Sequence, residues 1–458
     1  LGHAMSFLIN YLYAKKYEGK CILRFDDTNP EKESQEFVDA MEQDVIEYLD
    51  IKPDQVIFAS DYMPRFYQAA ADLIKEDKAY SCSCKSEDIS KARRDMKECA
   101  CRKKSVKVVE DDWVAMVTGN VKVGAFSLRL KIDMQHKNAV MRDPVIMRIC
   151  ETKHYRQGDE YKVWPMYDFE NALMDGWLNM SHVLRSNEFD TRIELHDYIK
   201  SLFGLVKCEF IHYGRYNVTG MTTQGREIRE KIDSGEMIGW DDPRLLTLRA
   251  LKRRGIMKDA YYQLVKQIGL SKTQTNLDFG VIAAINRRIL DEEANRYFFV
   301  EEPVEISVKD WPQELNSVEL KLHPHKNRGG RPLKIDGTFF IGKKDFDKVT
   351  DGKVVRLIDT ANIRYDKEAK SFVFHSLSVD DFKKLAKDEK NGFIHFLPKN
   401  EKLVSARVFL PDATYVEGLC EPSITQIKEG THLQFERVCF ARLDAIEKGV
   451  YTFWFAHE

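Results

Sequence analysis

The chain has 458 residues, a length that exceeds one hydrophobic core and predicts about three or four domains. Its residues are 43% apolar and 31% charged, as in ordinary folded proteins, and its net charge of −2 excludes a uniformly basic nucleic-acid-binding surface but permits local basic patches. No apolar run approaches a membrane span, no signal peptide is seen, and nine cysteines, an odd number, exclude a secreted disulfide framework, so we expect a cytoplasmic protein.

The first residues predict a ligand site at the edge of a sheet. Apolar side chains recur at helical spacing over residues 4–17, and residues 21–25 have the pattern of a short buried strand. A polar run leaves the carboxyl end of this strand, where open α/β sheets bind their ligands. Gly2 permits close approach of a ligand to the backbone, and the free N–H groups of a helix start favour an anion. We therefore expect a phosphate-bearing ligand between His3 and Asp26.

The next segment continues the same architecture. A short strand is expected at residues 55–59, and Ser60-Asp61-Tyr62 is expected to cap a helix that runs to about Lys78. Helices that alternate with short buried strands are typical of a doubly wound α/β domain.

Four cysteines then interrupt the pattern. Cys82 and Cys84 form one Cys-x-Cys pair, and Cys99 and Cys101 form a second pair about fifteen residues later. Two such pairs can enclose a tetrahedral zinc ion with four thiolates. The alternative is a set of four reduced thiols on a surface loop. Cysteine is rare and mostly buried, so four cysteines in a polar segment favour the zinc site.

Strand patterns are expected over residues 106–163. Residues 126–132 and 145–149 alternate between apolar and polar side chains, and residues 141–144 are expected to form the turn between them. An inserted sheet is therefore predicted.

The parallel sheet is expected to resume at residues 164–169 and to continue at residues 182–188, with a further helix that runs to Phe203. Tyr167 and Arg185 should lie near strand ends that face the ligand crevice. An arginine after an apolar strand is usually a surface residue, but its guanidinium can bind a carboxylate through two charge-assisted hydrogen bonds and cannot accept one from an amide NH₂.

The second half of the chain changes from helical to β-rich. A last sheet strand is expected at residues 212–215, and residues 244–300 are predicted to be helical throughout, with Arg249, Lys252 and Arg253 on one basic helix. Short strands separated by turn clusters follow from about residue 301, which predicts antiparallel barrels. The expected strands are 354–358, 372–374, 405–410, 433–443 and 450–455.

These motifs resemble, in order, those of the class I glutamyl- and glutaminyl-tRNA synthetases. Leu1-Gly2-His3 resembles the end of the HxGH signature, and residues 24–30 resemble the RFDDTNP segment. Residues 182–185 resemble the HVLR motif, which carries its arginine in the glutamate branch of the family. WDDPRL at 240–245 and NRRILD at 286–291 resemble the helical domain that contacts the inside of the tRNA L. The C-terminal strands resemble the anticodon-binding barrels of the archaeal and eukaryotic glutamyl enzymes.

One motif departs from the family pattern. Family members place a KMSKS-type loop after the last sheet strand, where a lysine stabilises the triphosphate. Met221-Thr222-Thr223 can represent the middle of this motif, but the lysine is absent and Arg226 is the nearest substitute. The first histidine of the HxGH signature and the strand before it, on which glutamyl enzymes carry a substrate-binding arginine, are expected to precede Leu1.

The resemblance implies an ATP-dependent glutamate–tRNA ligase that forms glutamyl-adenylate and transfers the glutamyl group to the 2′-hydroxyl of the terminal adenosine of tRNA. It implies catalytic roles for His3 and Arg226. It implies ATP contacts from Gly2, His3, Glu188, Met221, Thr222 and Thr223, amino-acid contacts from Asp26, Tyr167 and Arg185, and tRNA contacts from Trp240, Arg244, Arg287 and Arg288. Mg²⁺ would accompany ATP, and zinc would be held by Cys82, Cys84, Cys99 and Cys101.

The resemblance also implies a multidomain α/β organisation and a set of partners. A Rossmann-like catalytic domain is expected in two halves, with an inserted acceptor-end-binding domain that carries the zinc module, a KMSKS-type loop with a helical stem-contact domain, and a β-barrel anticodon-binding domain. The expected boundaries are 1–80 and 164–216 for the catalytic halves, 81–163 for the insertion, 217–300 for the loop and helical domain, and 301–458 for the barrels. Expected partners are glutamate, ATP and the tRNA for glutamate, and we expect a monomer that contacts no membrane.

Three alternatives stay open from the sequence. A glutaminyl enzyme is compatible with Asp26 and Tyr167 but is opposed by Arg185 and the cysteine cluster. A glutamyl enzyme could also charge the tRNA for glutamine. A synthetase-like protein that binds tRNA without activating an amino acid is suggested by the missing lysine.

Overall fold

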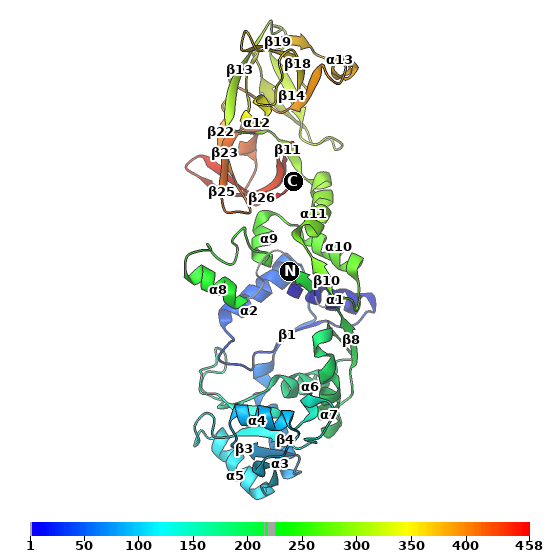
Figure 1. Cartoon of the computed structure of the whole chain (residues 1–458), viewed down its shortest axis with the longest axis vertical. Coiled ribbons are helices and arrows are strands. Elements are labelled where there is room, and N and C mark those ends of the chain that lie inside the picture. Colours follow the sequence, from blue (N-terminus) through cyan, green and yellow to red (C-terminus); the bar gives the residue numbers. More distant parts are fainter. Residues whose placement is uncertain (1, 215, 219–224) are drawn as a thin grey trace. The chain divides into compact units, whose positions relative to one another are not determined.

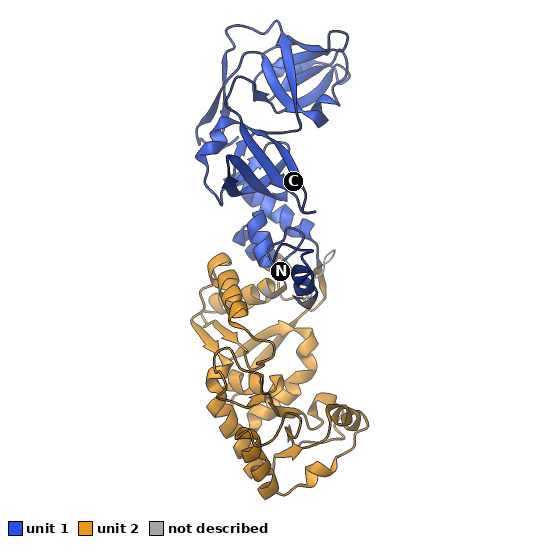
Figure 2. Ribbon diagram, turned by 90° about the vertical axis from the view of Figure 1, so that its left-hand side faces the viewer, with its two compact units in different colours: residues 1, 218–264, 277–458 blue, residues 2–217, 265–276 orange. Residues whose placement is uncertain are grey.

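The computed structural model describes residues 2–214, 216–218 and 225–458. The chain separates into two compact units, which are coloured in Figure 2. The catalytic unit comprises Gly2–Asn217 and Val265–Asn276, and the barrel unit comprises Val218–Leu264 and Leu277–Glu458. Figure 1 labels the elements of each unit. Among the helices of the described residues, none combines the length and apolar character needed to cross a bilayer.

The catalytic unit contains two pairs of parallel strands. β1 (Ile22–Phe25) pairs with β2 (Gln55–Phe58), and β7 (His182–Ser186) pairs with β8 (Glu209–Tyr213). Helix α1 (Gly2–Lys16) buries a face against this region, and Asn10 Nδ2 on it donates a hydrogen bond to the Leu184 carbonyl of β7 at 3.0 Å. The predicted first helix and the strands of both pairs are confirmed, although β8 begins and ends earlier than residues 212–215.

Helices and short helical turns connect these strands. They are α2 (Gln35–Glu42), the π-helical turn η1 (Gln43–Tyr48), η2 (Ala59–Tyr62), α3 (Met63–Lys75), α6 (Tyr167–Trp177), η5 (Asn187–Arg192) and α7 (Ile193–Leu202). The segment Ser60-Asp61-Tyr62 directly precedes α3, and Tyr62 is the N-cap residue, but no side chain of the segment caps the helix: the Ser60 hydroxyl donates to Asp27 at 2.8 Å instead.

A four-stranded antiparallel sheet is inserted between the two parallel pairs. Its order is β3 (Ala79–Cys82), β4 (Ser127–Leu130), β5 (Val145–Ile149) and β6 (Val163–Pro165). The predicted parallel strand at residues 164–169 is therefore wrong, since β6 runs antiparallel to β5 and α6 begins at Tyr167. The other elements of this region are α4 (Ser86–Arg94), η3 (Ala100–Lys103), α5 (Val106–Val117) and η4 (Ala139–Met141).

The strand pattern predicted from residue 106 is also wrong at its start. Residues 106–117 form α5, because Val109, Trp113 and Met116 recur at helical spacing and are buried together with α3. A short segment with few apolar residues fits a helix about as well as a strand. The packing against α3 decides in favour of the helix.

Helices follow β8, but the helical run predicted over residues 244–300 is interrupted by strands. α8 (Gly225–Asp233), α9 (Leu248–Arg254), α10 (Lys258–Ile268) and α11 (Phe279–Glu293) are helical, whereas β9 (Tyr216–Val218), β10 (Thr275–Leu277), β11 (Asn295–Tyr297) and β12 (Phe299–Glu301) are strands. The buried Arg254 at the end of α9 donates to the carbonyl groups of Pro243, Phe455 and Ala456, which ties the helices to the last strand.

Two seven-stranded sheets follow, and one chain segment closes each of them into a barrel. The first has the order β11-β24-β25-β26-β22-β23-β12, and its two edge strands β11 and β12 are consecutive in the chain, separated by Phe298 alone. The second has the order β20-β17-β18-β19-β13-β16-β21, and β20 and β21 are likewise consecutive. A segment that pairs with both edges leaves a sheet without a free edge.

The barrel strands have the following bounds. The first barrel contains β22 (Val404–Phe409), β23 (Tyr415–Cys420), β24 (His432–Phe435), β25 (Cys439–Glu447) and β26 (Val450–His457), with η6 (Pro422–Gln426). The second contains β13 (Pro303–Lys309), β16 (Thr338–Gly342), β17 (Val354–Leu357), β18 (Asn362–Asp366), β19 (Ser371–Ser376), β20 (Lys390–Ile394) and β21 (Leu397–Pro398), with α12 (Lys343–Phe346), α13 (Val379–Lys384) and the hairpin of β14 (Ser317–Lys321) and β15 (Gly330–Lys334).

The barrels are confirmed, with two corrections. They are mixed rather than antiparallel, because β11 with β24, β13 with β19, β17 with β20 and β22 with β26 are parallel pairs. The single strand predicted at residues 433–443 is two strands, β24 and β25, joined by a turn in which Arg437 adopts a positive φ of 65°.

A buried ion pair joins the two barrels. Arg331 on β15 and Glu421 after β23 lie 2.5 Å apart, with 2% and 0% of their side chains exposed. The backbone N–H of Phe298, between β11 and β12, also donates to Glu421 at 2.9 Å. Because both charges are removed from water, the loss of either one would leave the other buried and unpaired.

We predict that Glu421→Ala destabilises the barrel unit by about 3–5 kcal/mol, because it leaves the Arg331 guanidinium buried and unpaired. Urea unfolding followed by tryptophan fluorescence measures this, since Trp311 and Trp454 lie in the two barrels. The control is Glu305→Ala, which removes a half-exposed partner of Lys399 and should change stability by less than about 0.5 kcal/mol. Equal effects of the two substitutions would contradict the role given to the buried pair.

Candidate active site and metal centre

Arg185, at the carboxyl-terminal part of β7, is a cation that forms no ion pair with the described residues. Its guanidinium lies over the ring of Phe210 at 4.8 Å and the ring of Phe189 at 5.3 Å. Its Nη1 is 3.5 Å from the hydroxyl of Tyr167. Its Nε and Nη2 atoms are buried and have no hydrogen-bond partner among the described residues. Buried N–H groups of a cation are costly to leave unpaired, so this arrangement suits a bound carboxylate.

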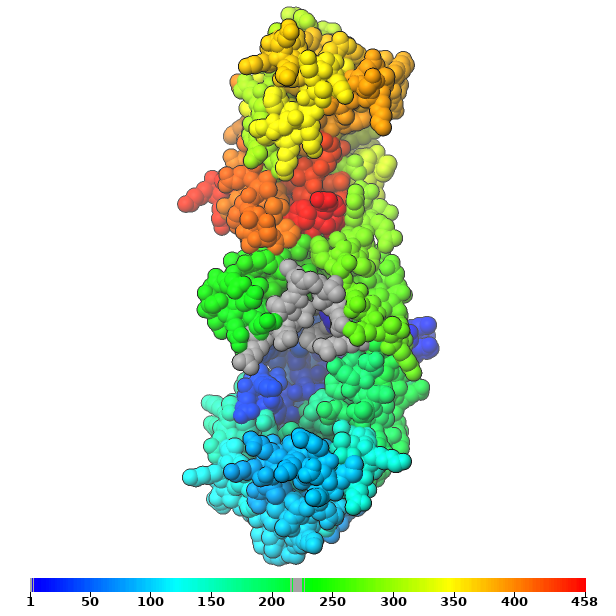
Figure 3. All heavy atoms as spheres, in the orientation of Figure 1, coloured from blue at the N-terminus to red at the C-terminus, as the bar shows by residue number. Residues whose placement is uncertain are grey.

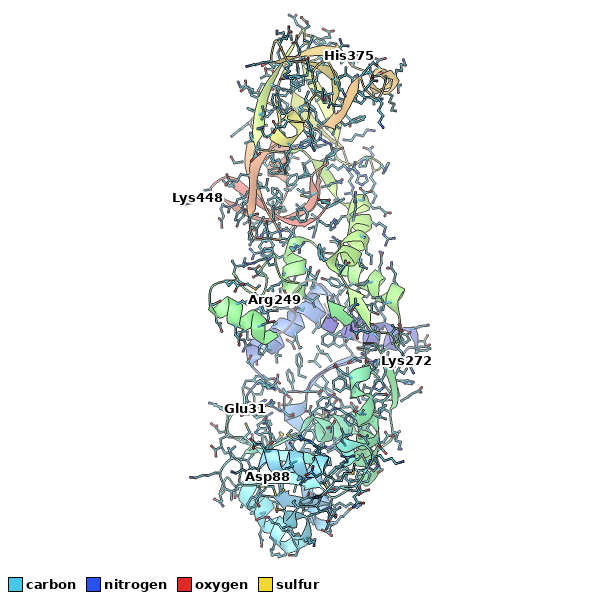
Figure 4. The ribbon with its side chains drawn as sticks, in the orientation of Figure 1. Glu31, Asp88, Arg249, Lys272, His375 and Lys448 are labelled. Carbon is cyan, nitrogen blue, oxygen red and sulfur yellow. The ribbon has the colours of Figure 1, made fainter. Side chains whose placement is uncertain are left out.

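Two histidines lie beside Arg185, and each of them contacts a carboxylate. His212, opposite Arg185 on β8, contacts Asp190 through Nδ1 at 2.9 Å, and His196 on α7 contacts Asp168 through Nε2 at 3.1 Å. Burial lowers the pKa of both imidazoles, and the charge of Arg185 lowers each pKa further. Lys272, labelled in Figure 4, adds to this effect on His212. The second ring nitrogen of each histidine is buried and unpaired within the described part of the chain.

Asp26 is the negative counterpart, immediately after β1. Arg24 Nε is 2.6 Å from Asp26 Oδ1, and Asn171 Nδ2 on α6 donates to Asp26 Oδ2 at 3.2 Å. Arg24 also contacts Asp175 at 2.7 Å. The Asp26 side chain keeps 34% of its surface exposed, so its carboxylate is fixed in place but can still receive a ligand.

Tyr167 senses both charges. The pKa of its hydroxyl is raised to about 12, mainly by burial, with the Arg185 guanidinium opposing the rise and the Asp26 carboxylate adding to it. The tyrosine, the first residue of α6, thus lies near the predicted cation and the predicted anion of the amino-acid site. The structure therefore brings Asp26, Tyr167 and Arg185 to one region of the catalytic unit.

Several residues of this region were not found from the sequence. Asp27 is buried and accepts hydrogen bonds from the Ser60 backbone and hydroxyl and from Tyr155, each at 2.8 Å. The His154 ring contacts the Asp27 carbonyl at 2.7 Å, which anchors the inserted region beside Asp26. Polar residues at positions 168, 171 and 175 of α6 recur at helical spacing inside an otherwise buried helix, and this is the signal that could have found Asn171 and Asp175.

The predicted ATP contacts are described in part. Gly2 and His3 lie in the first turn of α1, and a side chain on Gly2 would meet the Tyr216 carbonyl at an unstrained 3.9 Å. Glu188 lies on η5, where the Ser186 hydroxyl donates to it at 2.9 Å. Met221, Thr222 and Thr223 lie outside the described residues, as do the side chains of His3 and Arg226.

The four predicted metal ligands converge. The sulfur atoms of Cys82, Cys84, Cys99 and Cys101 all lie within 4.8 Å of one another, and those of Cys82 and Cys99 are 3.8 Å apart. A Zn–S distance of about 2.3 Å places the sulfurs of a tetrahedral site about 3.8 Å apart, so this set fits zinc. Arg129 Nη1 lies 3.8 Å from two of the sulfurs, where it would stabilise thiolates.

The chain around these cysteines lies at the surface. Cys84 precedes α4, on which Asp88 is labelled in Figure 4, and residues of the range 85–105 cover part of the face shown in Figure 3. α4 buries only Ile89, and η3 buries none of its residues. Apolar packing is therefore scarce here, and a bound metal would supply the organisation that a core otherwise supplies.

The predicted tRNA contacts differ in how free they are. Arg287 and Arg288 on α11 are exposed and have no ion pair among the described residues. Arg244 forms two hydrogen bonds to Asp242 at 2.8 Å and a third to the Glu236 carbonyl at 2.5 Å. Trp240 packs at the edge of a small apolar cluster. The first two arginines are thus available to phosphates, whereas Arg244 and Trp240 also organise their own loop.

Comparisons with known proteins identify the class. The family model described as tRNA synthetases class I (E and Q), catalytic domain, matches residues 1–292, and two models described as the anti-codon binding domain of the same enzymes match residues 294–380 and 374–444. The chain belongs to the class I tRNA synthetases of the glutamate and glutamine (E and Q) group. The C-terminal barrels are its anticodon-binding domains, as predicted.

Two similar curated proteins are archaeal glutamate–tRNA ligases. A glutamate–tRNA ligase of Pyrococcus furiosus is 35% identical over 469 residues, and one of Methanobrevibacter smithii is 37% identical over 459 residues. In both cases the match covers 100% of this chain and 80% of the relative. A solved glutamate tRNA ligase of Elizabethkingia meningosepticum is 15% identical with a TM-score of 0.45, covering 64% of this chain and 68% of that one.

We predict that purified, reduced protein contains about one zinc ion per chain, with Zn–S distances of about 2.3 Å by X-ray absorption. Cys99→Ser should abolish stoichiometric zinc and make residues 80–105 sensitive to protease, because the module has little apolar core of its own. The control is Cys21→Ser, which changes a half-buried thiol outside the cluster and should retain the metal. Full zinc content in the Cys99 variant would refute the assignment.

Proposed function

We propose that this chain is a glutamate–tRNA ligase. The observation that carries the proposal is Arg185, whose buried Nε and Nη2 atoms have no partner among the described residues and lie in an aromatic-lined pocket of a glutamate/glutamine synthetase fold. A side-chain carboxylate satisfies two such donors. The side-chain amide of glutamine would instead direct its own N–H donor at them. The pocket chemistry therefore favours glutamate.

The amino acid would be bound at both ends by opposite charges. Asp26 would accept the α-ammonium group, and Arg185 with Tyr167 would receive the side-chain carboxylate. The α-carboxylate then attacks the α-phosphorus of ATP, pyrophosphate leaves, and glutamyl-adenylate forms. In the second step the 2′-hydroxyl of the terminal adenosine attacks the acyl carbon and AMP leaves. The protein contributes mainly positioning and charge stabilisation.

The nucleotide would bind at the start of α1. Gly2 and His3 would hold the phosphates, with Mg²⁺ sharing their charge, and Glu188 would contact the ribose. Met221, Thr222 and Thr223 would close on the leaving pyrophosphate, with Arg226 in place of the family lysine. A helix N-terminus supplies free N–H groups for such an anion.

The tRNA would extend from the zinc module to the barrels. Zinc held by Cys82, Cys84, Cys99 and Cys101 would shape the acceptor-end region, and Arg287 and Arg288 would contact phosphates. Trp240 and Arg244 would contact the tRNA from their loop. The barrels decide whether the tRNA for glutamine is charged as well as that for glutamate. We also propose a monomer in the cytoplasm, where a reducing environment keeps the nine free cysteines as thiols.

The rival functions make distinct predictions in one assay. Glutamate-dependent exchange of pyrophosphate into ATP supports the proposal, whereas exchange that depends on glutamine supports a glutaminyl enzyme. Because the KMSKS lysine is absent, a protein that binds tRNA without activation is the third candidate, and it would show no exchange with either amino acid. The exchange assay should be run both in the presence and in the absence of tRNA.

We predict that Arg185→Ala lowers kcat/KM for glutamate activation about 10³-fold or more, because the substrate carboxylate is left desolvated and unpaired. The preference over glutamine should fall toward unity, since sites built on such hydrogen bonds discriminate by about 10⁴–10⁵. Pyrophosphate exchange with each amino acid measures both quantities. The control is Arg156→Ala, which removes a surface partner of Asp61 in the same unit and should leave the ratio unchanged. A wild-type ratio in Arg185→Ala would show that another residue reads the side chain.

We further predict that His3→Ala lowers kcat about 10²- to 10³-fold with little change in glutamate KM, the usual effect of losing one preorganised donor to a developing charge. Arg226→Ala should have a smaller effect, because Arg226 only substitutes for the family lysine. Steady-state kinetics with ATP and glutamate varied separately provide the test. A rise in glutamate KM at constant kcat would place His3 at the amino acid instead.

A further inference from the structure

Glu170 is a buried carboxyl group next to the predicted ammonium-binding residue. It lies in the first turn of α6 and is 2% exposed. The Thr28 hydroxyl donates to its Oε2 at 2.7 Å. Its Oε1 is buried and receives no hydrogen bond from the described residues. A fully buried carboxylate with an unpaired oxygen is unfavourable, so the group needs either a cation or a proton.

The nearby cation is already shared by other carboxylates. Arg24 pairs with Asp26 at 2.6 Å and with Asp175 at 2.7 Å, and it forms no ion pair with Glu170 among the described contacts. If all three carboxyl groups were ionised, one guanidinium would face three negative charges in a largely buried cluster. Because Asp26 and Asp175 hold the guanidinium, the unpaired Glu170 is the group that retains a proton.

The pKa of Glu170 is shifted in the direction that favours a retained proton. Burial raises the pKa of Glu170 well above its ordinary value, and the Asp26 charge and a hydrogen bond between the two side chains raise it further. The Thr28 hydrogen bond and the Arg24 charge oppose this without reversing it. The protonated form of Glu170 is therefore the favoured one.

We propose that Glu170 is a neutral carboxylic acid at physiological pH that donates its proton in a hydrogen bond to Asp26 and so positions the Asp26 carboxylate for the ammonium group of the amino-acid substrate. Glu170 is a positioning residue, and this role rests on the proposed function of Asp26. One cation and two ionised carboxylates then leave the cluster with a single negative charge. That charge matches one ammonium group.

Two substitutions separate a neutral acid from a required negative charge. In Glu170→Gln the amide NH₂ can donate to Asp26 and the amide oxygen can accept from Thr28, so glutamate KM should stay within about threefold of wild type. Glu170→Ala removes the donor to a charged group and should raise glutamate KM about 10- to 100-fold, with ATP KM unchanged. An equal loss in both variants would overturn the proposal.

An infrared difference spectrum gives a readout that does not depend on activity. Wild-type apoprotein minus Glu170→Gln at neutral pH should show the C=O stretch of a protonated carboxyl group, and wild type minus Glu151→Gln, an exposed carboxylate, should not. Absence of the band would refute a neutral Glu170 even if the enzyme activates glutamate. Presence of the band without any glutamate activation would instead leave Glu170 neutral and refute the proposed function. Thermal unfolding of each variant establishes that it is folded.

Discussion

The guanidinium of Arg185, whose buried Nε and Nη2 groups have no partner among the described residues, is the constraint on which the proposed amino-acid site depends. This guanidinium lies over the rings of Phe189 and Phe210, which provide no anion. The imidazoles of His196 and His212 are kept neutral by burial and by this same charge, so they do not compete for the ligand. We infer that the free energy of leaving such a cation unpaired is recovered when a carboxylate binds, which would make the site selective by charge and by geometry.

The opposite end of the site is negative, and the inserted region helps to hold it. Asp26 is fixed by Arg24 and Asn171, and the adjacent Asp27 is bound by groups from η2 and from the His154-Tyr155 segment. The region that precedes β6 thus contributes directly to the placement of the strand end that carries Asp26. A zwitterionic substrate with a second carboxylate complements this pair of charges. The anticodon-binding barrels form cores of their own.

Periodic apolar patterns predicted the elements that bury a single face. The first helix, the strands of both parallel pairs and fewer than half of the barrel strands were found because their buried faces repeat at a fixed spacing. Residues 106–117 and 164–169 were misassigned, since a short apolar segment fits a helix or either strand direction until its neighbours are known. The segment that begins at Ser60 provides no side-chain cap for a related reason: the Ser60 hydroxyl donates to Asp27, a residue distant in sequence. Two of the four parallel pairs within the barrels, β11 with β24 and β17 with β20, are formed by the segments that close the barrels, and no local pattern reveals them.

The residues of the site divide along the same line. Asp26, Tyr167, Arg185 and the four cysteines stand in short motifs whose chemistry is readable from residue types. Glu170, Asn171 and Asp175 are single polar residues on a buried helix, and their significance appears only when Arg24 is placed beside them.

We infer above all that Arg185 binds the side-chain carboxylate of the substrate. A crystal structure of the full-length protein with tRNA, glutamate and a non-hydrolysable ATP analogue tests it most directly. The account predicts that Nε and Nη2 of Arg185 lie about 2.7–2.9 Å from the two side-chain carboxylate oxygens, with the substrate ammonium on Asp26. Glutamate bound with its α-carboxylate on Arg185, or with its side chain paired to another cation, would contradict it.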